Sequence, residues 1–270
     1  MDLLSTRVDG HEVIYRTAGT KANDPLVLLH GWGASSRYWD KTCEGLLLHH
    51  HCIMPDLPGF GLSQKPRIRY SIDNLTRLFE GFLDRLELDR INLVGHSMGS
   101  MIAMKMAANN PDRVRRLCIV NPPFRGWEAL SGFHRFSLVP GIRCFMYLLM
   151  KTPFGRKWIS KDFTYDTPLD KEIVDDLGMP TYRSGIQSIL SLIDTDALPA
   201  VQKLTMPVLQ IGTDKDKVIN PAQRDLFPGK EHFQSIQIEN AGHIPMIEKP
   251  EEFLQALSSF LVPSTVTASS

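Results

Sequence analysis

The sequence predicts an α/β fold with a mostly parallel sheet of eight strands, helices on both faces of the sheet, and a helical cap inserted after the sixth strand. Three observations lead to this prediction. Short apolar runs alternate with longer amphipathic segments, the alternation stops between residues 122 and 204, and a glycine-bounded turn joins one apolar run directly to a helical pattern. A chain of 270 residues is long enough to bury the core of one such domain.

The predicted strands are short apolar runs bounded by turn-forming residues. The first stretch of the chain, clearest at residues 12–16, predicts an antiparallel hairpin at one edge of the sheet. Six further strands are predicted over residues 25–30, 52–55, 91–95, 117–120, 207–211 and 233–238.

Between these strands, apolar residues recur at helical spacing. The predicted helices cover residues 35–48, 71–88, 98–109 and 250–261. Ser71 and Pro250 are typical of helix starts, which supports the beginnings of two of these helices.

The segment from residue 122 to residue 204 is too long for an ordinary connection in a compact domain. We therefore expect it to be a helical cap, or lid, inserted into a core formed by residues 1–121 and 205–262. Residues 263–270 are small and polar, and we expect a flexible tail there.

The composition of the chain limits the kinds of partner and the cellular compartment that we expect for this protein. The chain has 30 basic and 30 acidic side chains, so no net field attracts nucleic acid or an anionic bilayer, and we expect a small or uncharged partner. No apolar run has the length of a membrane span, so stable membrane insertion is not expected.

The four cysteines form no Cys-x-x-Cys pair, which favours reduced thiols in the cytoplasm. The histidines at 49–51 are expected to be a solvated surface and not a metal site. The oligomeric state is not predicted.

A serine turn carries the clearest chemical signal. Gly95-His96-Ser97-Met98-Gly99 follows a predicted strand and opens a predicted helix, which is the setting of a nucleophile elbow. Side chains two residues before or after the serine would collide in so tight a turn, so glycine is needed at both places. The helix N-terminus favours negative charge that develops beside it. We predict that Ser97 is a nucleophile.

A serine hydroxyl needs a general base, and the base needs a group that orients it. His243 follows the last predicted strand and precedes the last helix, so we predict that it is the base. The loop after the strand at 207–211 offers Asp214 and Asp216, and the chain order serine, acid, histidine allows either to orient the imidazole.

An oxyanion hole is predicted after the first parallel strand. His30-Gly31-Trp32-Gly33 follows that strand directly, and its glycines let the backbone turn so that the Trp32 amide points into the site. With the Met98 amide it would hold the negative oxygen of a tetrahedral intermediate.

With these segments in place, the chain resembles the α/β-hydrolase superfamily, specifically its soluble, cap-bearing, esterase-like branch, over nearly its whole length. Asp56-Leu57-Pro58-Gly59-Phe60-Gly61-Leu62-Ser63 is similar to the family's loop after the next strand, and residues 242–250 are similar to its histidine loop. The resemblance implies that Asp56 is a structural loop residue and not a catalyst.

The resemblance also favours Asp216 as the acid, because Lys217-Val218-Ile219-Asn220-Pro221 is similar to the turn that usually follows that residue. Two departures from the family pattern stand beside it. Ser100 follows Gly99 where many relatives have a second glycine, and the acid loop is one residue longer than the common spacing, which keeps Asp214 as the alternative.

The predicted cap is rich in aromatic and thioether side chains, and part of them should line an apolar pocket over Ser97. The residues assigned to substrate contact are Phe124, Trp127, Phe145 and Met146. The resemblance and the triad chemistry together imply hydrolysis of carboxylic esters of small to medium apolar substrates through an acyl-enzyme on Ser97. This chemistry requires no metal, nucleotide or organic cofactor.

Other functions fit the same residues. Hydrolysis of carbon-carbon bonds, hydroxynitrile cleavage and perhydrolysis use a Ser-His-Asp set, and a ligand receptor could be built on the same scaffold. Dehalogenases and epoxide hydrolases of this fold have an aspartate at the elbow, so the serine at position 97 argues against them. Basic residues of the cap could bring it to a bilayer surface, although a solvated face is favoured; they are Arg143, Lys151, Arg156, Lys157 and Lys161.

Overall fold

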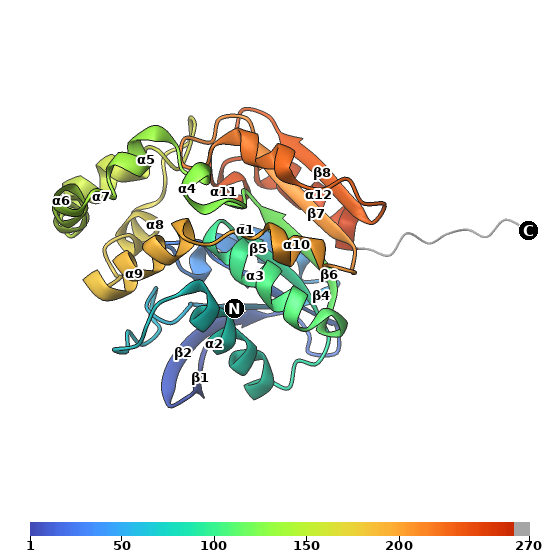
Figure 1. Cartoon of the computed structure of the whole chain (residues 1–270). Helices are drawn as coiled ribbons and strands as arrows, with labels where there is room; N and C mark the ends of the chain where they lie inside the picture. Colours follow the sequence, from blue (N-terminus) through green and yellow to red (C-terminus); the bar gives the residue numbers. More distant parts are fainter. Residues whose placement is uncertain (262–270) are drawn as a thin grey trace, which may run out of the picture.

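The computed structural model describes residues 1–261, and its strands form one eight-stranded sheet in the order β1-β2-β4-β3-β5-β6-β7-β8 (Figure 1). The hairpin expected at the edge is present as β1 (Asp2–Val8) and β2 (His11–Ala18), and β2 also pairs antiparallel with β4. The other neighbours pair in parallel. These strands are β3 (Asp24–Leu29), β4 (His50–Pro55), β5 (Ile91–His96), β6 (Val114–Val120), β7 (Val208–Thr213) and β8 (Phe233–Ile238). The predicted fold class is therefore confirmed.

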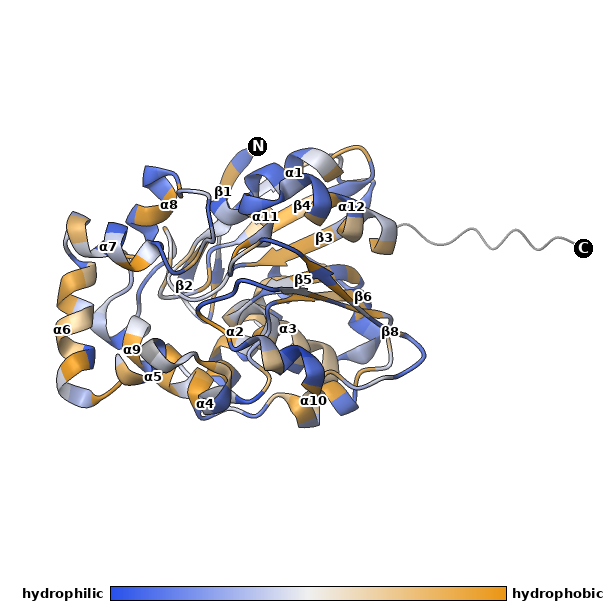
Figure 2. Ribbon diagram, turned by 90° about the horizontal axis from the view of Figure 1, so that it is seen from above, coloured by the Kyte–Doolittle hydropathy of each residue, from blue (hydrophilic) through white to orange (hydrophobic). Residues whose placement is uncertain are grey.

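Helices cover both faces of the sheet, as Figure 2 shows from above. The pleat of β3 sends Val27 and Leu29 to one hydrophobic cluster and Leu26 and Leu28 to the other, because successive side chains of a strand point to opposite faces. The first cluster lies under α2 (Ile72–Arg85), α3 (Met98–Asn109) and α10 (Leu198–Gln202). The second lies under η1 (Ser36–Trp39), α1 (Asp40–Leu46) and α12 (Pro250–Leu261).

Side-chain capping and a proline residue explain where several of the helices begin. The Ser71 side chain accepts a hydrogen bond from Asn74 N and caps α2, and Pro250 is the first residue of α12. The segment predicted as one helix from residue 35 begins with the short 3-10 helix η1, because the Ser35 hydroxyl accepts from Arg37 N and tightens the first turn.

The segment between β6 and β7 is helical, as expected, and most of it gathers at one end of the sheet (Figure 1). We call residues 122–204 the insertion. Its last helix, α10, packs against α3 within the first hydrophobic cluster, so this part of the insertion covers the sheet. A division of the chain into a core and a cap domain stays a prediction. Its other helices are α4 (Gly126–Ala129), α5 (Gly132–Phe136), α6 (Pro140–Met150), α7 (Pro153–Ser160), α8 (Lys171–Asp176) and α9 (Tyr182–Ile193).

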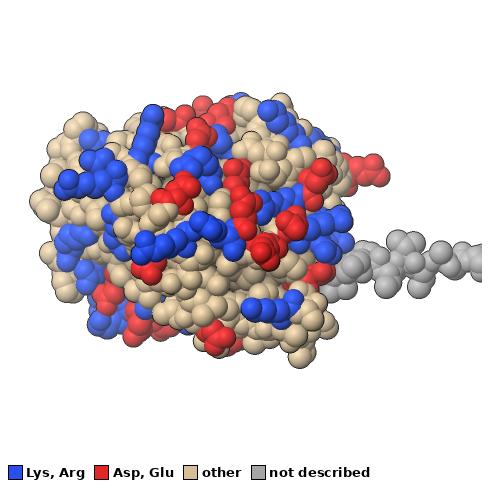
Figure 3. All heavy atoms as spheres, turned by 90° about the horizontal axis from the view of Figure 1, so that it is seen from below, with Lys and Arg blue, Asp and Glu red and all other residues tan. Residues whose placement is uncertain are grey.

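Three short helices complete the chain: η2 (Pro111–Arg113), η3 (Pro221–Leu226) and α11 (Pro245–Glu248). The tail predicted at 263–270 lies outside the described residues. In the part of the chain that is described, no helix has the length and apolarity needed to cross a bilayer. Basic and acidic side chains are interspersed over much of the face in Figure 3, in keeping with their equal numbers.

Candidate active site

Ser97 lies at the sharp turn between β5 and α3, where the sequence places it. Its backbone has φ 52° and ψ −118°, a conformation that an L-residue adopts only under strain. The Ser97 amide donates a 2.9 Å hydrogen bond to Val120 O on the neighbouring strand β6, which holds the turn against the sheet. Such a strained elbow presents the serine side chain to the space above the sheet.

The two glycines around Ser97 are required by close backbone packing. A Cβ at position 95 would lie 2.5 Å from Gly99 O, and a Cβ at position 99 would lie 2.6 Å from Leu29 O. Both distances are far below van der Waals contact. The clash at position 95 lies within the turn, as expected, whereas the clash at position 99 is with the neighbouring strand β3. Ser100 adds a constraint that the sequence did not reveal, because its buried hydroxyl donates to Gly95 O at 2.6 Å and ties α3 to β5.

Asp216 and His243 form the central polar pair of the site. The Asp216 Oδ2 atom is 2.7 Å from His243 Nδ1, and both side chains are nearly inaccessible to solvent. Asp214 lies differently: its carboxylate pairs with Lys215 Nζ at 2.7 Å, and it accepts a long 3.4 Å bond from Ala241 N. Of the two acids that the loop offers, only Asp216 is bonded to the histidine among the described residues.

The loop that carries His243 is fixed by its main chain. The His243 carbonyl accepts from His96 Nε2 at 2.8 Å and from Asn121 Nδ2 at 3.0 Å, and its amide donates to Phe163 O at 2.8 Å. A carbonyl can only accept, so the Nε2 atom of His96 carries its proton. Burial, and then the neighbouring His243, lower the pKa of His96 well below its usual value, so this ring is a neutral support.

Glu248 fixes the same loop from its other side. Its carboxylate accepts from Gly242 N at 2.5 Å and from Tyr165 N at 2.6 Å, so it joins the histidine loop to the insertion. His96, Asn121 and Glu248 were not assigned roles from the sequence. Only the proximity of His96 to Ser97 and the place of Glu248 in the histidine-loop motif could have signalled them.

The segment predicted to supply an oxyanion donor lies beside the serine. A Cβ at position 31 would be only 3.1 Å from Ser97 Cβ, so Gly31 allows this backbone to approach Ser97. His30 braces the segment, because its Nε2 accepts from Leu57 N at 2.9 Å and its Nδ1 donates to Gly31 O at 2.7 Å. Burial lowers the pKa of His30, which favours this neutral form. Trp32 follows and lines the cavity, and Met98 is the first residue of α3, so its amide has no acceptor within the helix.

Asp56 is structural, as the resemblance implies. Its two carboxylate oxygens accept from Ser36 N and Leu62 N, each at 2.7 Å, and hold the loops that follow β3 and β4 together. It does not line the cavity that contains Ser97.

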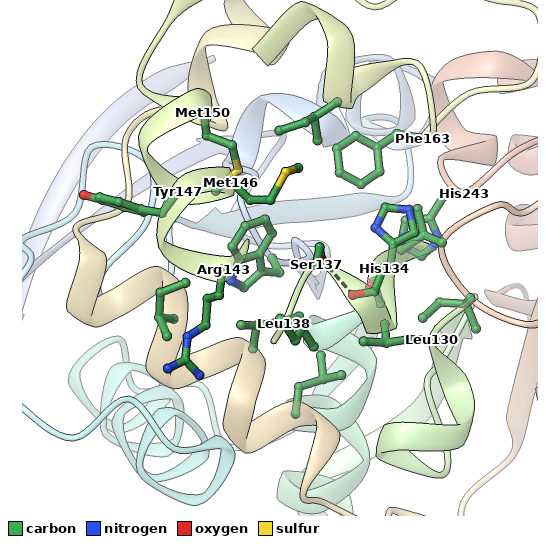
Figure 4. A pocket seen from close by; sticks show the side chains of 18 of the residues that line it. Leu130, His134, Ser137, Leu138, Arg143, Met146, Tyr147, Met150, Phe163 and His243 are labelled. Carbon is green, nitrogen blue, oxygen red and sulfur yellow. Dashed lines mark hydrogen bonds between the residues drawn. The ribbon is translucent and has the colours of Figure 1, made fainter. Parts of the chain in front are cut away.

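A largely apolar cavity opens above Ser97 and His243 and is roofed by the insertion (Figure 4). Leu130, Leu138, Met146 and Phe163 belong to its wall, together with side chains of α9 and of the acid loop. Apolar walls with a few polar groups are typical of small-molecule sites. Within residues 1–261, no group of three or more His, Cys, Asp or Glu side chains is arranged to hold a metal ion.

One of the four residues predicted to contact substrate lines this cavity: Met146. Phe124 is fully buried and stacks on Phe227 beneath the sheet, so it is a core residue. Trp127 is half exposed under the guanidinium of Arg135, away from the cavity. These two assignments were wrong because composition identifies an aromatic-rich segment without telling which side of each helix faces the site.

Phe145 was also misassigned, because the sequence did not show which face of its helix meets the cavity. It is 63% exposed on the outer side of α6. Arg143, Met146 and Met150 line the cavity from the same helix, at the i, i+3, i+7 spacing of one helix face. Arg143, His134 and Ser137 are polar lining residues that the sequence interpretation missed.

Buried polar contacts join the insertion to the parts of the chain that form the site. Asp176 of α8 accepts from the Ser35 hydroxyl and, at 2.8 Å, from Arg37 Nη1. Burial outweighs these favourable partners and raises the pKa of Asp176 to about 6. On α9, Gly185 O accepts from Trp32 Nε1 at 2.8 Å.

Comparison with known proteins places this geometry in a family. The family described as "alpha/beta hydrolase fold" matches residues 24–250. The (E)-2-((N-methylformamido)methylene)succinate hydrolase of Acinetobacter baylyi is 28% identical over 246 residues, which cover 88% of this chain and 90% of that protein. Lipase 1 of Psychrobacter immobilis is 26% identical over 273 residues, covering 94% and 82%. A solved structure described as a membrane phospholipase A, a bacterial virulence factor, superposes with a TM-score of 0.82 at 27% identity, covering 96% of this chain and 85% of that one. The chain belongs to the α/β hydrolase fold family.

Proposed function

We propose that this hydrolase is a serine esterase that cleaves carboxylic esters through an acyl-enzyme on Ser97. The observation that carries the proposal is the buried 2.7 Å contact between Asp216 and His243, at the wall of the cavity that Ser97 also lines. A strained elbow serine, an acid and a histidine, in that chain order, are the parts of an acyl-transfer site.

The reaction proceeds in two stages. Ser97 Oγ attacks the ester carbonyl while His243 Nε2 takes its proton, and Asp216 stabilises the imidazolium that forms. The amides of Trp32 and Met98 bind the oxyanion, and His243 then protonates the leaving alcohol. His243 then takes a proton from water, whose oxygen attacks the acyl-enzyme, and gives that proton to Ser97 Oγ as the acid is released.

The apolar cavity supports a substrate with an alkyl or aromatic portion. Met146, Phe163 and their neighbours exclude water from the reacting carbonyl, which strengthens every charge interaction there. The names of the two relatives and of the solved structure fit hydrolysis of esters and of other acyl derivatives, and the substrate of this chain is part of the proposal.

The test is hydrolysis of p-nitrophenyl esters from short to long acyl chains by the native protein and by Ser97→Ala. We expect turnover in the native protein and a loss of about a millionfold in kcat in the variant. Asp214→Asn serves as a matched control and should retain activity, because this carboxylate is bonded elsewhere.

A fluorophosphonate probe separates the possible failures. If Ser97 is labelled but no ester is cleaved, the nucleophile is competent and ester hydrolysis is the wrong reaction. Carbon-carbon bonds and cyanohydrins would then be the substrates to assay. If Ser97 is not labelled, the proposed nucleophile itself is refuted.

A further inference from the structure

Among the described residues that line the cavity above Ser97, Arg143 is the only lysine, arginine, aspartate or glutamate. It lies on α6 one helical turn before Met146, and Figure 4 shows its guanidinium directed away from His243. A guanidinium stays protonated at any pH that a protein tolerates. The wall therefore holds a fixed positive charge without a carboxylate beside it.

Among the described residues, the guanidinium is also without a hydrogen-bond or ion-pair partner. Its Nε atom is buried and has no hydrogen-bond acceptor, and no ion pair with Arg143 is present within residues 1–261. Other partly buried arginines are paired: Arg37 with Asp176 and Arg156 with Asp175. A buried donor without an acceptor costs free energy, and the cost is larger for a charged group. An anionic group of a bound substrate would supply the acceptor that this guanidinium lacks.

We propose that Arg143 binds a terminal oxyanion of the substrate, so that the natural substrate is an ester with an anionic group at the end remote from the cleaved bond. The inference rests on the proposed esterase function. The planar fork of a guanidinium matches a carboxylate or a phosphate with two parallel hydrogen bonds. Apolar residues such as Leu138 and Met146 line the same space and suit the hydrocarbon segment between the two ends.

The test compares p-nitrophenyl monoesters of straight-chain diacids, from adipate to sebacate, with esters that carry a terminal carboxamide in place of the carboxylate. The amide has nearly the same shape without the charge. We expect the native protein to show a higher kcat/KM for the acid than for the amide, with a maximum at the chain length that spans Ser97 and Arg143. A third series with a terminal phosphate tells which oxyanion fits better.

In Arg143→Met the preference for the acid over the amide should fall by about ten- to a hundredfold, while the kcat/KM of the amide changes little. Arg143→Lys should retain part of the preference, because it keeps the charge but not the fork. The matched control is Lys157→Met, which removes one positive charge from an exposed position of the insertion and should leave the preference unchanged.

A binding measurement covers the case in which Arg143→Met does not fold. In Ser97→Ala, calorimetry should find octanoate bound at least about tenfold more tightly than octanamide, and the added Arg143→Lys change should reduce the difference. Equal kcat/KM for acid and amide at every length in the native protein would overturn the proposal. An equal loss of preference in Lys157→Met would overturn it as well. In either case, hydrolysis of the amide series with labelling of Ser97 would leave the esterase function standing.

Discussion

The two oxygens of Asp216 serve different partners: Oδ2 is 2.7 Å from His243 Nδ1, while Oδ1 accepts from Val218 N at 2.8 Å and Ile219 N at 2.9 Å. The backbone bonds fix the carboxylate, and the fixed carboxylate holds the imidazole in one orientation. A proton on Nδ1 leaves Nε2 as the basic atom of the ring. In the proposed mechanism, this arrangement prepares the histidine to accept the proton of Ser97.

Replacement of Asp216 by Asn should lower kcat by about ten-thousandfold, because the amide favours the wrong imidazole tautomer. The backbone bonds to Val218 and Ile219 can persist through the amide oxygen, so the melting temperature should change little. Steady-state hydrolysis of the best p-nitrophenyl ester measures the effect. A loss of comparable size in Asp214→Asn would show that the acid has been misassigned.

Gly99→Ala should destabilise the protein by about 3 kcal/mol or more, since the new methyl group would lie 2.6 Å from Leu29 O and His30 O. Gly141→Ala is the control, because a Cβ there meets nothing within 4 Å and lies in α6. It should stabilise the protein by about 0.5 kcal/mol. Urea unfolding compares the two, and an equal effect at both positions would contradict the packing argument.

Loss of the Glu248 side chain should loosen the histidine loop. Glu248→Ala leaves the amides of Gly242 and Tyr165 without their acceptor, at a cost of about 1–3 kcal/mol for each buried donor. We expect a lower melting temperature together with a lower kcat. The exposed Glu251, on the first turn of α12, provides the control, and Glu251→Ala should change neither quantity appreciably.

Ionisation of Asp176 should weaken the folded state. Its pKa is raised to about 6 from the usual 3.8, so its stabilising contribution is present below the lower value and is lost as the pH rises through the higher one. Relative to Asp176→Asn, the native protein should lose roughly 2–3 kcal/mol of unfolding free energy between pH 4 and pH 7. Urea titrations at several pH values give this difference.

Asp175→Asn is the control for that titration. Asp175 is partly exposed, and its hydrogen bond to Lys171 lowers the pKa of its carboxyl. It is therefore ionised over the whole range, and its variant should show no pH trend relative to the native protein. A trend of the same size in both variants would mean that another group titrates.

Thiol reagents should distinguish Cys144 from the other cysteines. Cys144 is exposed on α6, whereas Cys43, Cys52 and Cys118 are buried. We expect one thiol per chain to react rapidly with Ellman's reagent in the native protein, and all four after unfolding. Rapid labelling that survives Cys144→Ser would show that the buried thiols become accessible.

The sequence predicts the sheet well, because buried parallel strands are short apolar runs whatever surrounds them. The predicted run at 233–238 has the same bounds as β8, and the other predicted strands overlap the observed ones. The predicted ends of helices are less exact, because hydrogen bonds and backbone conformation, and not the spacing of apolar residues, determine where a helix ends. The helix predicted over 71–88 ends at Arg85, because Leu86 leaves the helical conformation, with φ −96° and ψ 4°, and Glu87 takes a positive φ of 54°.

The residues proposed for the chemistry could be named from the sequence because backbone geometry limits what can stand there. Glycine is sterically required on both sides of Ser97, so this requirement can be recognised in the sequence. The order of serine, acid and histidine follows from the order of strands that end at one edge of the sheet.

Tertiary structure decided the rest. The sequence could not separate Asp214 from Asp216 by position, because only the turn of the loop after β7 determines which carboxylate reaches His243. It could not show that Phe124 and Phe145 turn away from the cavity or that Arg143 turns toward it, because the angle at which each helix packs on its neighbours sets those directions. The sequence by itself thus determined the fold and the residues proposed to react, through local sterics and burial, whereas the packing of the insertion over the sheet determined the shape and charge of the pocket.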